Sequence, residues 1–344
     1  MTAANDALAL IADIGGTNAR FALTDTTTVM PSVLQPASLC NAEFASLQHA
    51  AEHYIAWVGV KPQRAAIAVA SPVGTDEIRL TNRAWSFSRR ELQQTLALTD
   101  LRVLNDFGAV AWAVPALAGD DCITLHGRDS TPLRGPVTVL GPGTGLGVAQ
   151  LVGTSHGGWQ VVETEGGHVT FAPIGGEEQA LARWFTARFG RASNERLLCG
   201  NGLSHIDAVL REAGSSAARK ALLLREPALR EPILRDPADI VAAALEGHDV
   251  AARRALARFC AVLGSVAGDA ALIHGARTVM IAGGIVPRFV PFLRSSAFRE
   301  RFLAKGRFAA YLESVTIRVI THSHPGLLGA AVALRAHVDE DHHR

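Results

Sequence analysis

The pair Asn105-Asp106 stands between two apolar segments of the chain. Leu101-Arg-Val-Leu104 predicts a strand, and residues 108–114, ahead of Pro115, predict an apolar helix. Because α/β folds bind ligands at the carboxyl ends of strands, Asp106 is a candidate base that takes the proton from a hydroxyl group during phosphoryl transfer. An aspartate at such a position also commonly caps the following helix. Position alone slightly favours the cap, and both interpretations stay open.

A second polar cluster consists of Glu165-Gly-Gly-His168 and Glu195. Carboxylates and a histidine supply the acceptors and bidentate partners that the hydroxyl groups of a sugar require. The two glycines predict an exposed turn and not a helix face. A zinc site is disfavoured, because no second histidine or cysteine lies at ligand spacing. Taken alone, the motif is a weak indication of a sugar site.

Three glycine-rich segments could bind phosphate, since glycine lets successive backbone N–H groups approach an anion. They are Ala12-Asp13-Ile14-Gly15-Gly16-Thr17, Gly141-Pro-Gly143-Thr144-Gly145-Leu-Gly147, and Gly283-Gly284. The first two each lie between two short apolar runs and predict β-hairpins. Asp13 and Thr17 add groups able to orient Mg²⁺ and a phosphate oxygen. Each turn could equally be a tight hairpin turn alone, although four glycines within 141–147 exceed what a hairpin needs.

Two common nucleotide-binding patterns are absent from the sequence. No Gly-x4-Gly-Lys-Ser/Thr segment occurs, which excludes a Walker-type NTPase. Neither glycine-rich turn matches Gly-x-Gly-x-x-Gly between a strand and a helix, which disfavours a dinucleotide fold. A nucleotide held by two β-hairpins remains, and this arrangement is typical of the actin-like ATPase and hexokinase superfamily.

The elements that position these segments follow from periodicity and capping residues. Strands are predicted at 8–12, 19–23, 65–70, 101–104, 137–140, 148–152 and 277–282. Helices are predicted at 42–57 after Asn41, from Ser88 to about 98, and at 108–114, 177–189, 250–273 and 327–337. The Arg-Glu/Asp-Pro repeat within 224–237 predicts a solvated connector that ends where Asp236 caps the next helix. Composition loosens after 116, which we take as the first domain boundary.

Length and composition indicate a two-lobed globular protein of 344 residues with a formal charge of +1. There is no basic excess to bind nucleic acid. The four cysteines are far apart, which predicts reduced thiols in a cytoplasmic protein. No basic segment precedes the first apolar run, so a signal peptide is not expected. Charged residues interrupt 250–273, which predicts a buried helix and no membrane span.

The sequence resembles the bacterial glucokinase family, within the hexokinase and actin-like superfamily. The resemblance runs in order from the first strand to the last helix and covers nearly the whole chain. The segments that carry it are Ile11-Ala-Asp-Ile-Gly-Gly-Thr-Asn-Ala-Arg20, Leu104-Asn-Asp-Phe107, Leu140-Gly-Pro-Gly-Thr-Gly-Leu-Gly-Val148, Glu165-Gly-Gly-His-Val169, Asn194-Glu-Arg196, Ile281-Ala-Gly-Gly-Ile-Val-Pro-Arg288 and Pro325-Gly-Leu-Leu-Gly329.

This resemblance implies an ATP-dependent glucokinase that binds Mg²⁺ with the nucleotide and forms a homodimer. The implied fold has a small α/β lobe over 1–116, rejoined by 324–344, and a larger α+β lobe over 117–323, with the sugar in the cleft between them. Residues 12–17 and 141–147 would be phosphate loops, with Gly283 and Gly284 against the adenosine. The residues implied to hold glucose are Asn105, Asp106, Glu165, His168 and Glu195, with Asp106 as the base toward the 6-hydroxyl.

The sequence departs from related proteins at two places. No cysteine-rich zinc motif follows His168, which favours the glucokinase branch over the related repressor and sugar-kinase family. Ser323-His324 stands where relatives tend to have Asp-Asn. Competing hypotheses are a kinase for another hexose or an amino sugar, a polyphosphate-dependent kinase, a sugar-sensing regulator and an actin-like ATPase. A regulator would need a DNA-binding module before residue 8, and an ATPase leaves the cluster at 165, 168 and 195 unexplained.

Overall fold

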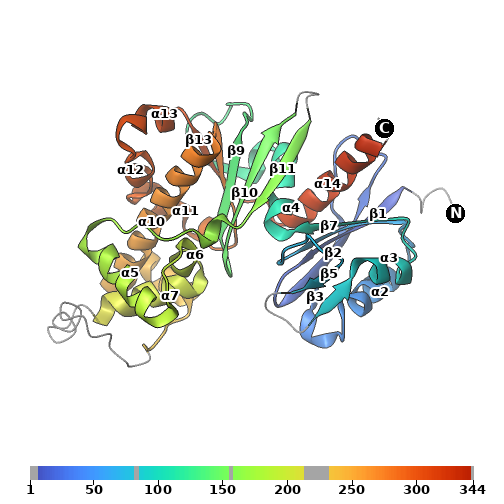
Figure 1. The fold of residues 1–344 in the computed structure, drawn as a ribbon, viewed down its shortest axis with the longest axis horizontal. Coiled ribbons are helices and arrows are strands. Elements are labelled where there is room, and N and C mark those ends of the chain that lie inside the picture. The colour runs from blue at the N-terminus through green and yellow to red at the C-terminus, as the bar shows by residue number, and fades with distance from the viewer. Residues whose placement is uncertain (1–6, 81–84, 155–157, 213–231, 342–344) are drawn as a thin grey trace. The chain divides into compact units, whose positions relative to one another are not determined.

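The computed structural model describes residues 7–80, 85–154, 158–212 and 232–341. Packing divides the chain into two compact units, each built from separate stretches of sequence. Unit 1 comprises Met1–Asp121, Thr154–Glu163 and His322–Arg344, and unit 2 comprises Cys122–Gly153 and Thr164–Thr321. The two-lobed α/β fold of the sugar kinases is thus present, and the order of its elements can be followed by colour (Figure 1).

Unit 1 is built on a five-stranded sheet of order β3-β2-β1-β4-β7. Strands β1, β4 and β7 are parallel, whereas β2 and β3 are antiparallel to their neighbours. Its elements are β1 (Leu8–Ile14), β2 (Asn18–Asp25), β3 (Leu34–Cys40), η1 (Asn41–Glu43), α2 (Leu47–Val58), β4 (Arg64–Val69), β5 (Glu77–Arg79), β6 (Ser86–Ser88), α3 (Arg89–Thr95), β7 (Asp100–Asn105), α4 (Asp106–Ala113), η2 (Val114–Ala116), η3 (Gly119–Asp121) and α14 (Pro325–Asp341).

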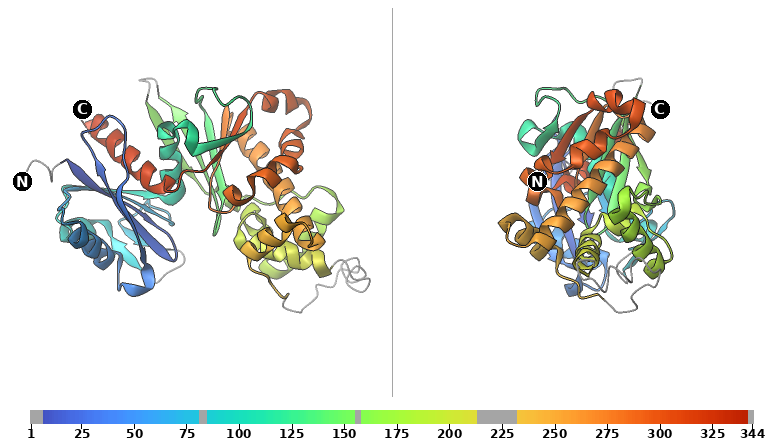
Figure 2. Two further views of the ribbon diagram at one scale, coloured as in Figure 1. Left: turned by 180° about the vertical axis from the view of Figure 1, so that it is seen from behind. Right: turned by 90° about the vertical axis from the view of Figure 1, so that its left-hand side faces the viewer.

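Strand β1 is buried on both faces, as its continuous apolar run predicts. Leu10, Ala12 and Ile14 pack in one cluster with side chains from α2 and α3. Ala9 and Ile11 alternate onto the other face, where α14 covers them. The left view of Figure 2 shows the red C-terminal helix lying along this sheet.

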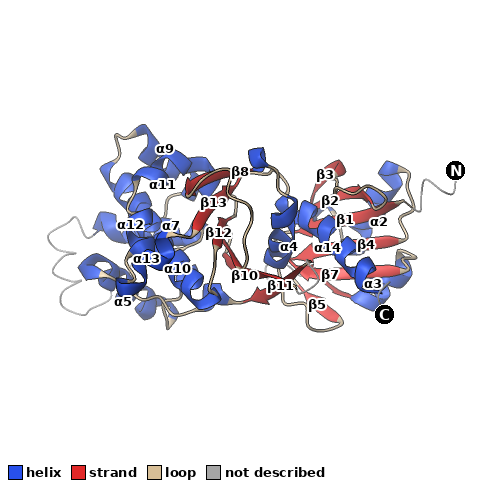
Figure 3. Cartoon of the chain, turned by 90° about the horizontal axis from the view of Figure 1, so that it is seen from above, coloured by secondary structure: helices blue, strands red, loops and turns tan. Residues whose placement is uncertain are grey.

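Helix α14 also packs against α4, the helix that begins at Asp106. Figure 3 shows the two helices side by side. Their backbones approach so closely that a Cβ added at Gly329 would lie 1.6 Å from the carbonyl oxygen of Ala109. The last helix of the chain therefore sets the position of α4.

Unit 2 contains a six-stranded sheet of order β11-β10-β9-β12-β13-β8, in which the residues of β11 up to Glu163 are counted with unit 1. Its strands are β8 (Cys122–His126), β9 (Val137–Pro142), β10 (Leu146–Gly153), β11 (Trp159–Thr164), β12 (Thr278–Ile281) and β13 (Thr316–Ile320). Its helices are η4 (Gly166–His168), α5 (Gly175–Phe189), α6 (Asn194–Leu197), α7 (Gly200–Glu212), α9 (Pro237–Glu246), α10 (Val250–His274), η5 (Val286–Phe289), α11 (Val290–Ser295), α12 (Phe298–Leu303), η6 (Gly306–Phe308) and α13 (Ala309–Glu313).

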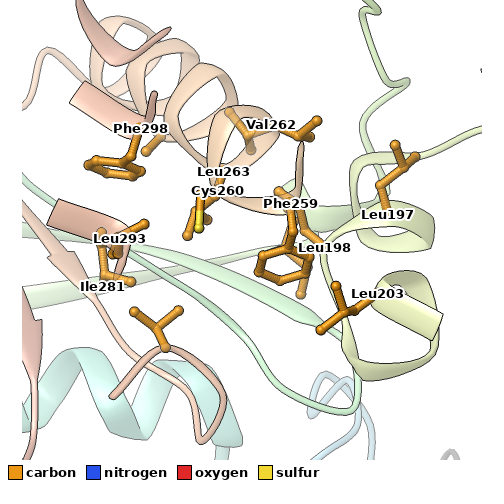
Figure 4. Packing of buried hydrophobic residues seen from close by; sticks show 14 of the residues in the cluster. Leu197, Leu198, Leu203, Phe259, Cys260, Val262, Leu263, Ile281, Leu293 and Phe298 are labelled. Atoms are coloured by element: carbon orange, nitrogen blue, oxygen red, sulfur yellow. The ribbon is translucent and has the colours of Figure 1, made fainter. Parts of the chain in front are cut away.

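Helix α10 is the central helix of unit 2 and packs against α7, α9, α12 and the sheet. Phe259, Cys260 and Leu263 are fully buried among side chains from neighbouring elements (Figure 4). The helix is long and apolar enough to cross a membrane, but 72% of its most apolar window is buried inside the protein. The prediction of a buried helix over 250–273 is confirmed.

One predicted helix start is wrong. Asn41 was expected to cap a helix over 42–57, but the helix begins at Leu47 and its cap is Ser46, which accepts a hydrogen bond from the backbone N–H of His49. Asn41 is instead fully buried and donates from its side chain to the carbonyl of Gly15. The caps predicted at Ser88 and Asp236 are confirmed. Of the three predicted repeats, 225–227 and the first two residues of 230–232 lie outside the described residues. None of the four cysteines, all in described segments, forms a disulfide.

Candidate functional site

Strand β7 delivers Asn105 and Asp106 to the carboxyl edge of the unit 1 sheet, where α4 begins. The N-cap of α4 is Asn105, whose Oδ1 accepts hydrogen bonds from the backbone N–H groups of Phe107 at 2.9 Å and Gly108 at 3.1 Å. Asp106 is the first helical residue, and its Oδ1 accepts the N–H of Phe107 at 2.8 Å. The capping role considered for Asp106 therefore belongs to its neighbour.

Capping limits what Asn105 can offer to a ligand. Its Oδ1 is engaged by the helix, whereas its Nδ2 makes one contact of 3.5 Å with the carbonyl of Ser71. Since that contact is at the long limit of a hydrogen bond, the amide N–H groups are the part of the side chain suited to a new acceptor. Asn105 can thus act as a donor toward a hydroxyl oxygen.

The first glycine-rich turn joins β1 and β2 at the same edge of the sheet. The N–H of Gly15 donates to the carbonyl of Asn18 at 3.0 Å and closes the turn. Asn41 supports it from beneath, because its backbone N–H donates to Thr17 at 3.0 Å and its Nδ2 donates to Gly15 at 2.9 Å. Sequence reasoning missed this role of Asn41, for which the chain carries no local signal.

The carboxylate of Asp13 lies at the end of β1, half-buried and 3.6 Å from a guanidinium nitrogen of Arg20. Burial raises the pKa of Asp13, and the positive charges of Arg20 and His324 oppose that rise. Gly326 stands so close that an added Cβ would lie 2.8 Å from Oδ2 of Asp13. The start of α14 therefore packs directly against this carboxylate.

His324 lies immediately before α14. Its backbone N–H donates to Nδ1 of His322 at 3.1 Å. Burial lowers the pKa of His324, the charges of Arg20 and His322 lower it further, and Asp13 opposes them. Burial and the neighbouring positive charges thus both disfavour the protonated imidazole, and the carboxylate of Asp13 favours it.

The segments 13–17 and 105–106 share one edge of the sheet because β1, β4 and β7 are parallel. Asp13 is paired with Ala68 of β4, and Asn105 is paired with Val69 of the same strand. Only one strand separates them, which corresponds to about 10 Å between β1 and β7. Unit 1 thus brings together the candidate base and the first candidate phosphate loop.

In unit 2 the second glycine-rich turn joins β9 and β10 and contacts the segment after β12. A Cβ added at Gly141 would lie 2.2 Å from the carbonyl oxygen of Ala282. A Cβ added at Gly283 would lie 2.2 Å from the carbonyl oxygen of Pro142. Gly283 also has a φ of +88°, which favours glycine. The N–H of Gly143 donates to Gly145 at 2.8 Å, and the N–H of Gly200, which begins α7, donates to Gly143 at 3.0 Å.

The second polar cluster forms around His168. Its Nε2 lies 3.8 Å from a carboxylate oxygen of Glu165, and its Nδ1 lies 3.8 Å from Oε1 of Glu195. The side chains of Glu165 and His168 are 65% and 57% exposed, so both are open to a ligand. Oε2 of Glu195 accepts the backbone N–H of Leu146 at 2.9 Å, which connects this cluster to the glycine-rich turn.

The turn that carries Glu165 and His168 is fixed by its neighbours. The hydroxyl of Thr164 donates to the carbonyl of Val148 at 2.7 Å and accepts the N–H of Gly166 at 3.2 Å. The guanidinium of Arg191 donates to the carbonyl of His168, at the other end of the turn. Sequence reasoning did not identify Thr164 or Arg191, because their contacts depend on residues distant in the chain.

The predicted site residues therefore form two groups, one in each unit. Unit 1 holds the segments 12–17 and 105–106, and unit 2 holds 141–145, 165, 168, 195 and 283–284. Within the described part of the chain, no group of three or more His, Cys, Asp or Glu side chains is arranged to hold a metal ion. The two groups together contain acceptors for hydroxyl groups, glycine-rich turns suited to phosphates and a candidate base.

Comparison with known proteins gives consistent matches over nearly the whole chain. The sequence model of a family described as Glucokinase matches residues 10–337. A glucokinase of Chromobacterium violaceum is 41% identical over 331 residues, covering 96% of this chain and 90% of that protein.

Solved structures show the same fold. The crystal structure of a glucokinase from an Antarctic psychrotroph has a TM-score of 0.79 and 34% identity, covering 96% of this chain and 99% of that one. A ROK family glucokinase from Streptomyces griseus, in complex with glucose and AMPPNP, has a TM-score of 0.61 and 20% identity, covering 96% and 99% of the two chains.

Proposed function

Because the chain belongs to the glucokinase family, we propose that Asp106 is the base that accepts the proton of the glucose 6-hydroxyl during phosphoryl transfer from ATP. The reaction of the chain is the ATP-dependent phosphorylation of glucose to glucose 6-phosphate. The observation that carries the role of Asp106 is the cap of α4, which is made by Asn105. The carboxylate at the end of β7 is therefore not required as the helix cap.

Glucose is held by Asn105, Glu165, His168 and Glu195 in this proposal. Carboxylate and imidazole groups accept hydrogen bonds from sugar hydroxyls, and the amide N–H groups of Asn105 donate to a hydroxyl oxygen. The distances from His168 to Glu165 and to Glu195, both 3.8 Å, support this proposal. They are too long for hydrogen bonds between the side chains, so all three side chains can accept hydrogen bonds from one ligand.

The nucleotide is held by Ala12, Asp13, Ile14, Gly15, Gly16 and Thr17, by Gly141, Gly143, Thr144 and Gly145, and by Gly283 and Gly284. Backbone N–H groups of the two turns stabilise the phosphates, and phosphoryl transfer needs mainly such positioning and charge stabilisation. An added Cβ at Gly143 or Gly284 would meet no atom within 4 Å, which leaves room for a ligand beside the backbone. Mg²⁺ would enter as part of the Mg²⁺-ATP substrate, and the oxygens of Asp13 and Thr17 would be available to orient it.

Several further properties belong to the proposal through the family resemblance. We expect a cytoplasmic homodimer that binds neither membrane nor nucleic acid. We also expect the small lobe to comprise 1–116 and 324–344 and the large lobe 117–323. The compact units agree in joining the two terminal segments, but they place 117–121, 154–163 and 322–323 in unit 1.

The decisive experiment replaces the base. Asp106→Asn should lower kcat by about 10²–10⁴-fold, because the amide cannot accept the proton. Asp100→Asn, at the opposite end of β7, is the matched control and should keep the wild-type kcat. Rates are measured by ADP release at saturating glucose and ATP, and thermal unfolding checks that both variants fold. Wild-type kcat in Asp106→Asn would show that the base is another group.

A panel of substrates tests the competing kinases. Glucose with ATP should give the highest kcat/KM, whereas mannose, fructose, glucosamine or polyphosphate should give lower values. ATP hydrolysis in the absence of sugar, at a rate comparable to that with glucose, would instead favour an ATPase. The sugar panel is read by product phosphate as well as ADP release, so that hydrolysis and transfer are separated.

A further inference from the structure

The carboxylate of Glu163 lies at the start of α4, next to the candidate base. Glu163 is the last residue of the middle stretch of unit 1 and belongs to β11. Its Oε1 accepts the backbone N–H of Asn105 at 3.0 Å. The N–H that it binds is therefore one peptide away from Asp106.

Gly108 provides the space for this carboxylate. A Cβ added at Gly108 would lie 2.4 Å from Oε1 of Glu163, 2.9 Å from Cγ and 3.0 Å from Cδ. These three atoms are the nearest ones, and all belong to Glu163. Even an alanine at position 108 would push the carboxylate away from the N–H of Asn105.

The location is favourable for a negative charge. The first turn of a helix presents N–H groups without helical partners, and the helix dipole is positive there. Oδ1 of Asn105 accepts the N–H groups of Phe107 and Gly108, and Glu163 accepts the N–H of Asn105 itself. These three contacts hold the strand-to-helix junction on both sides of Asp106.

We propose that Glu163 is a positioning residue for phosphoryl transfer, which fixes the direction of the Asp106 carboxylate by binding the backbone N–H of Asn105. This inference rests on the proposed role of Asp106 as the base. A base acts only within hydrogen-bond reach of the proton that it removes, and small displacements of catalytic groups are costly. Glu163 acts through Asn105 and does not touch the reacting atoms.

The first test separates the hydrogen bond from the charge. Glu163→Ala should lower kcat by about tenfold and leave the KM for ATP unchanged, because the nucleotide-binding turns are elsewhere. Glu163→Gln keeps an acceptor for the N–H of Asn105 and should retain at least half of the wild-type kcat. Gln160→Ala, an exposed residue of the same strand, is the matched control and should match the wild type.

The second test is a double-mutant cycle with Gly108. Gly108→Ala alone should lower kcat to a similar extent as Glu163→Ala, since the new methyl group displaces the same carboxylate. With Glu163→Ala already present, the added methyl group has nothing to displace, and Gly108→Ala should then change kcat little. Such strong non-additivity is expected of residues that act through one contact.

The outcomes distinguish this inference from its premise. If Asp106→Asn is inactive but Glu163→Ala keeps the wild-type kcat, the positioning role is wrong while the base assignment stands. Equal losses in Glu163→Ala and Glu163→Gln, or additive effects in the cycle, also overturn the inference. If Asp106→Asn is active, Asp106 is not the base and the positioning role of Glu163 falls with it. Thermal unfolding of every variant identifies a loss of fold. If Glu163→Ala does not fold, the kcat of Gly108→Ala tests the positioning role instead.

Discussion

Oε2 of Glu195 accepts the backbone N–H of Leu146 at 2.9 Å. One side chain of the candidate sugar cluster therefore binds the backbone of the candidate phosphate turn directly. Its other oxygen lies 3.8 Å from Nδ1 of His168. Both contacts lie within unit 2. A substitution in the turn should therefore change the affinity for glucose, and a substitution in the sugar cluster should change the affinity for the nucleotide.

This contact predicts that Gly145→Ala weakens glucose binding, although Gly145 belongs to the glycine-rich turn. An added Cβ would lie 2.5 Å from Oε2 of Glu195, and the carboxylate would move away from Leu146 and His168. We expect the KM for glucose to rise about tenfold, as loss of a charge-assisted hydrogen bond implies. Initial rates at varied glucose and saturating ATP measure it.

Gly143→Ala is the matched variant, because a Cβ there meets no atom within 4 Å. It should change the KM for ATP and leave that for glucose as in the wild type. If Gly145→Ala changed the KM for ATP alone, Glu195 would not couple the two segments.

His324→Asn should make unfolding less sensitive to acid. The pKa of His324 is lowered by burial and by Arg20 and His322, so the unfolded chain binds its proton more readily than the folded protein. Stability is therefore lost as the pH falls below the unfolded value of about 6.5. The melting temperature of the wild type should fall more than that of His324→Asn between about pH 7 and pH 5. Parallel curves for the two proteins would contradict the prediction.

Gly329→Ala should destabilise unit 1. Its methyl group would lie 1.6 Å from the carbonyl oxygen of Ala109, so α14 would have to move away from α4. We expect the free energy of unfolding to fall by about 3 kcal/mol, as in other overpacked cores. Gly176→Ala, in the first turn of α5 with no atom within 4 Å of the new Cβ, should instead be neutral or raise it by about 0.5–1 kcal/mol. Urea unfolding measures the free energy of unfolding of Gly329→Ala and Gly176→Ala. Equal changes in the two variants would refute close packing at Gly329.

Glu178→Gln should destabilise unit 2 strongly. Glu178 is fully buried and accepts hydrogen bonds from Arg258 at 2.8 Å, from Arg301 at 2.7 Å and from the backbone N–H of Ile174 at 2.8 Å. Removing its charge takes the paired carboxylate from Arg301, whereas Arg258 keeps Glu177, so we expect a cost of about 3 kcal/mol, the low end for a broken buried pair. The control is Glu313→Gln, since Glu313 and Arg299 are half-exposed and such pairs contribute about 1 kcal/mol or less.

The same residue predicts a pH dependence. Burial alone would raise the pKa of Glu178, but hydrogen bonds from Arg301, Ile174 and Arg258 together lower it. Its contribution is complete above the unfolded pKa of about 4.5 and is lost as the pH falls through the lower folded value. The difference between wild type and Glu178→Gln in urea unfolding should therefore shrink below that pH. A difference that stays constant in acid would contradict this assignment.

The hairpins and the strand that delivers Asp106 could be predicted from sequence, because apolar runs and glycines are local signals. Asn41 could not, since the same residue type suits a helix cap and a buried support for the turn at Gly15. Strand β3 was not predicted because its exposed residues and Pro36 lack an apolar pattern. Its place in the sheet comes from pairing with β2.

The contacts within the candidate site depend on separations along the chain that no motif records. Glu163 meets Asn105 across 58 residues, and Glu195 meets Leu146 across 49. Residue types and order were enough to suggest Asp106, Glu165, His168 and Glu195. They were not enough to show that Asn105 caps α4, which determines how the carboxylate beside it can be used.

The covering of β1 by α14 has a consequence for synthesis on the ribosome. Ala9 and Ile11 of the first strand pack against Leu327 and Ala330 of the last helix. Their apolar surface stays uncovered until residues 325–341 have been translated, and contacts between such distant residues form slowly. The N-terminal sheet must therefore wait for α14 before α4, with the candidate base at its start, takes its final position.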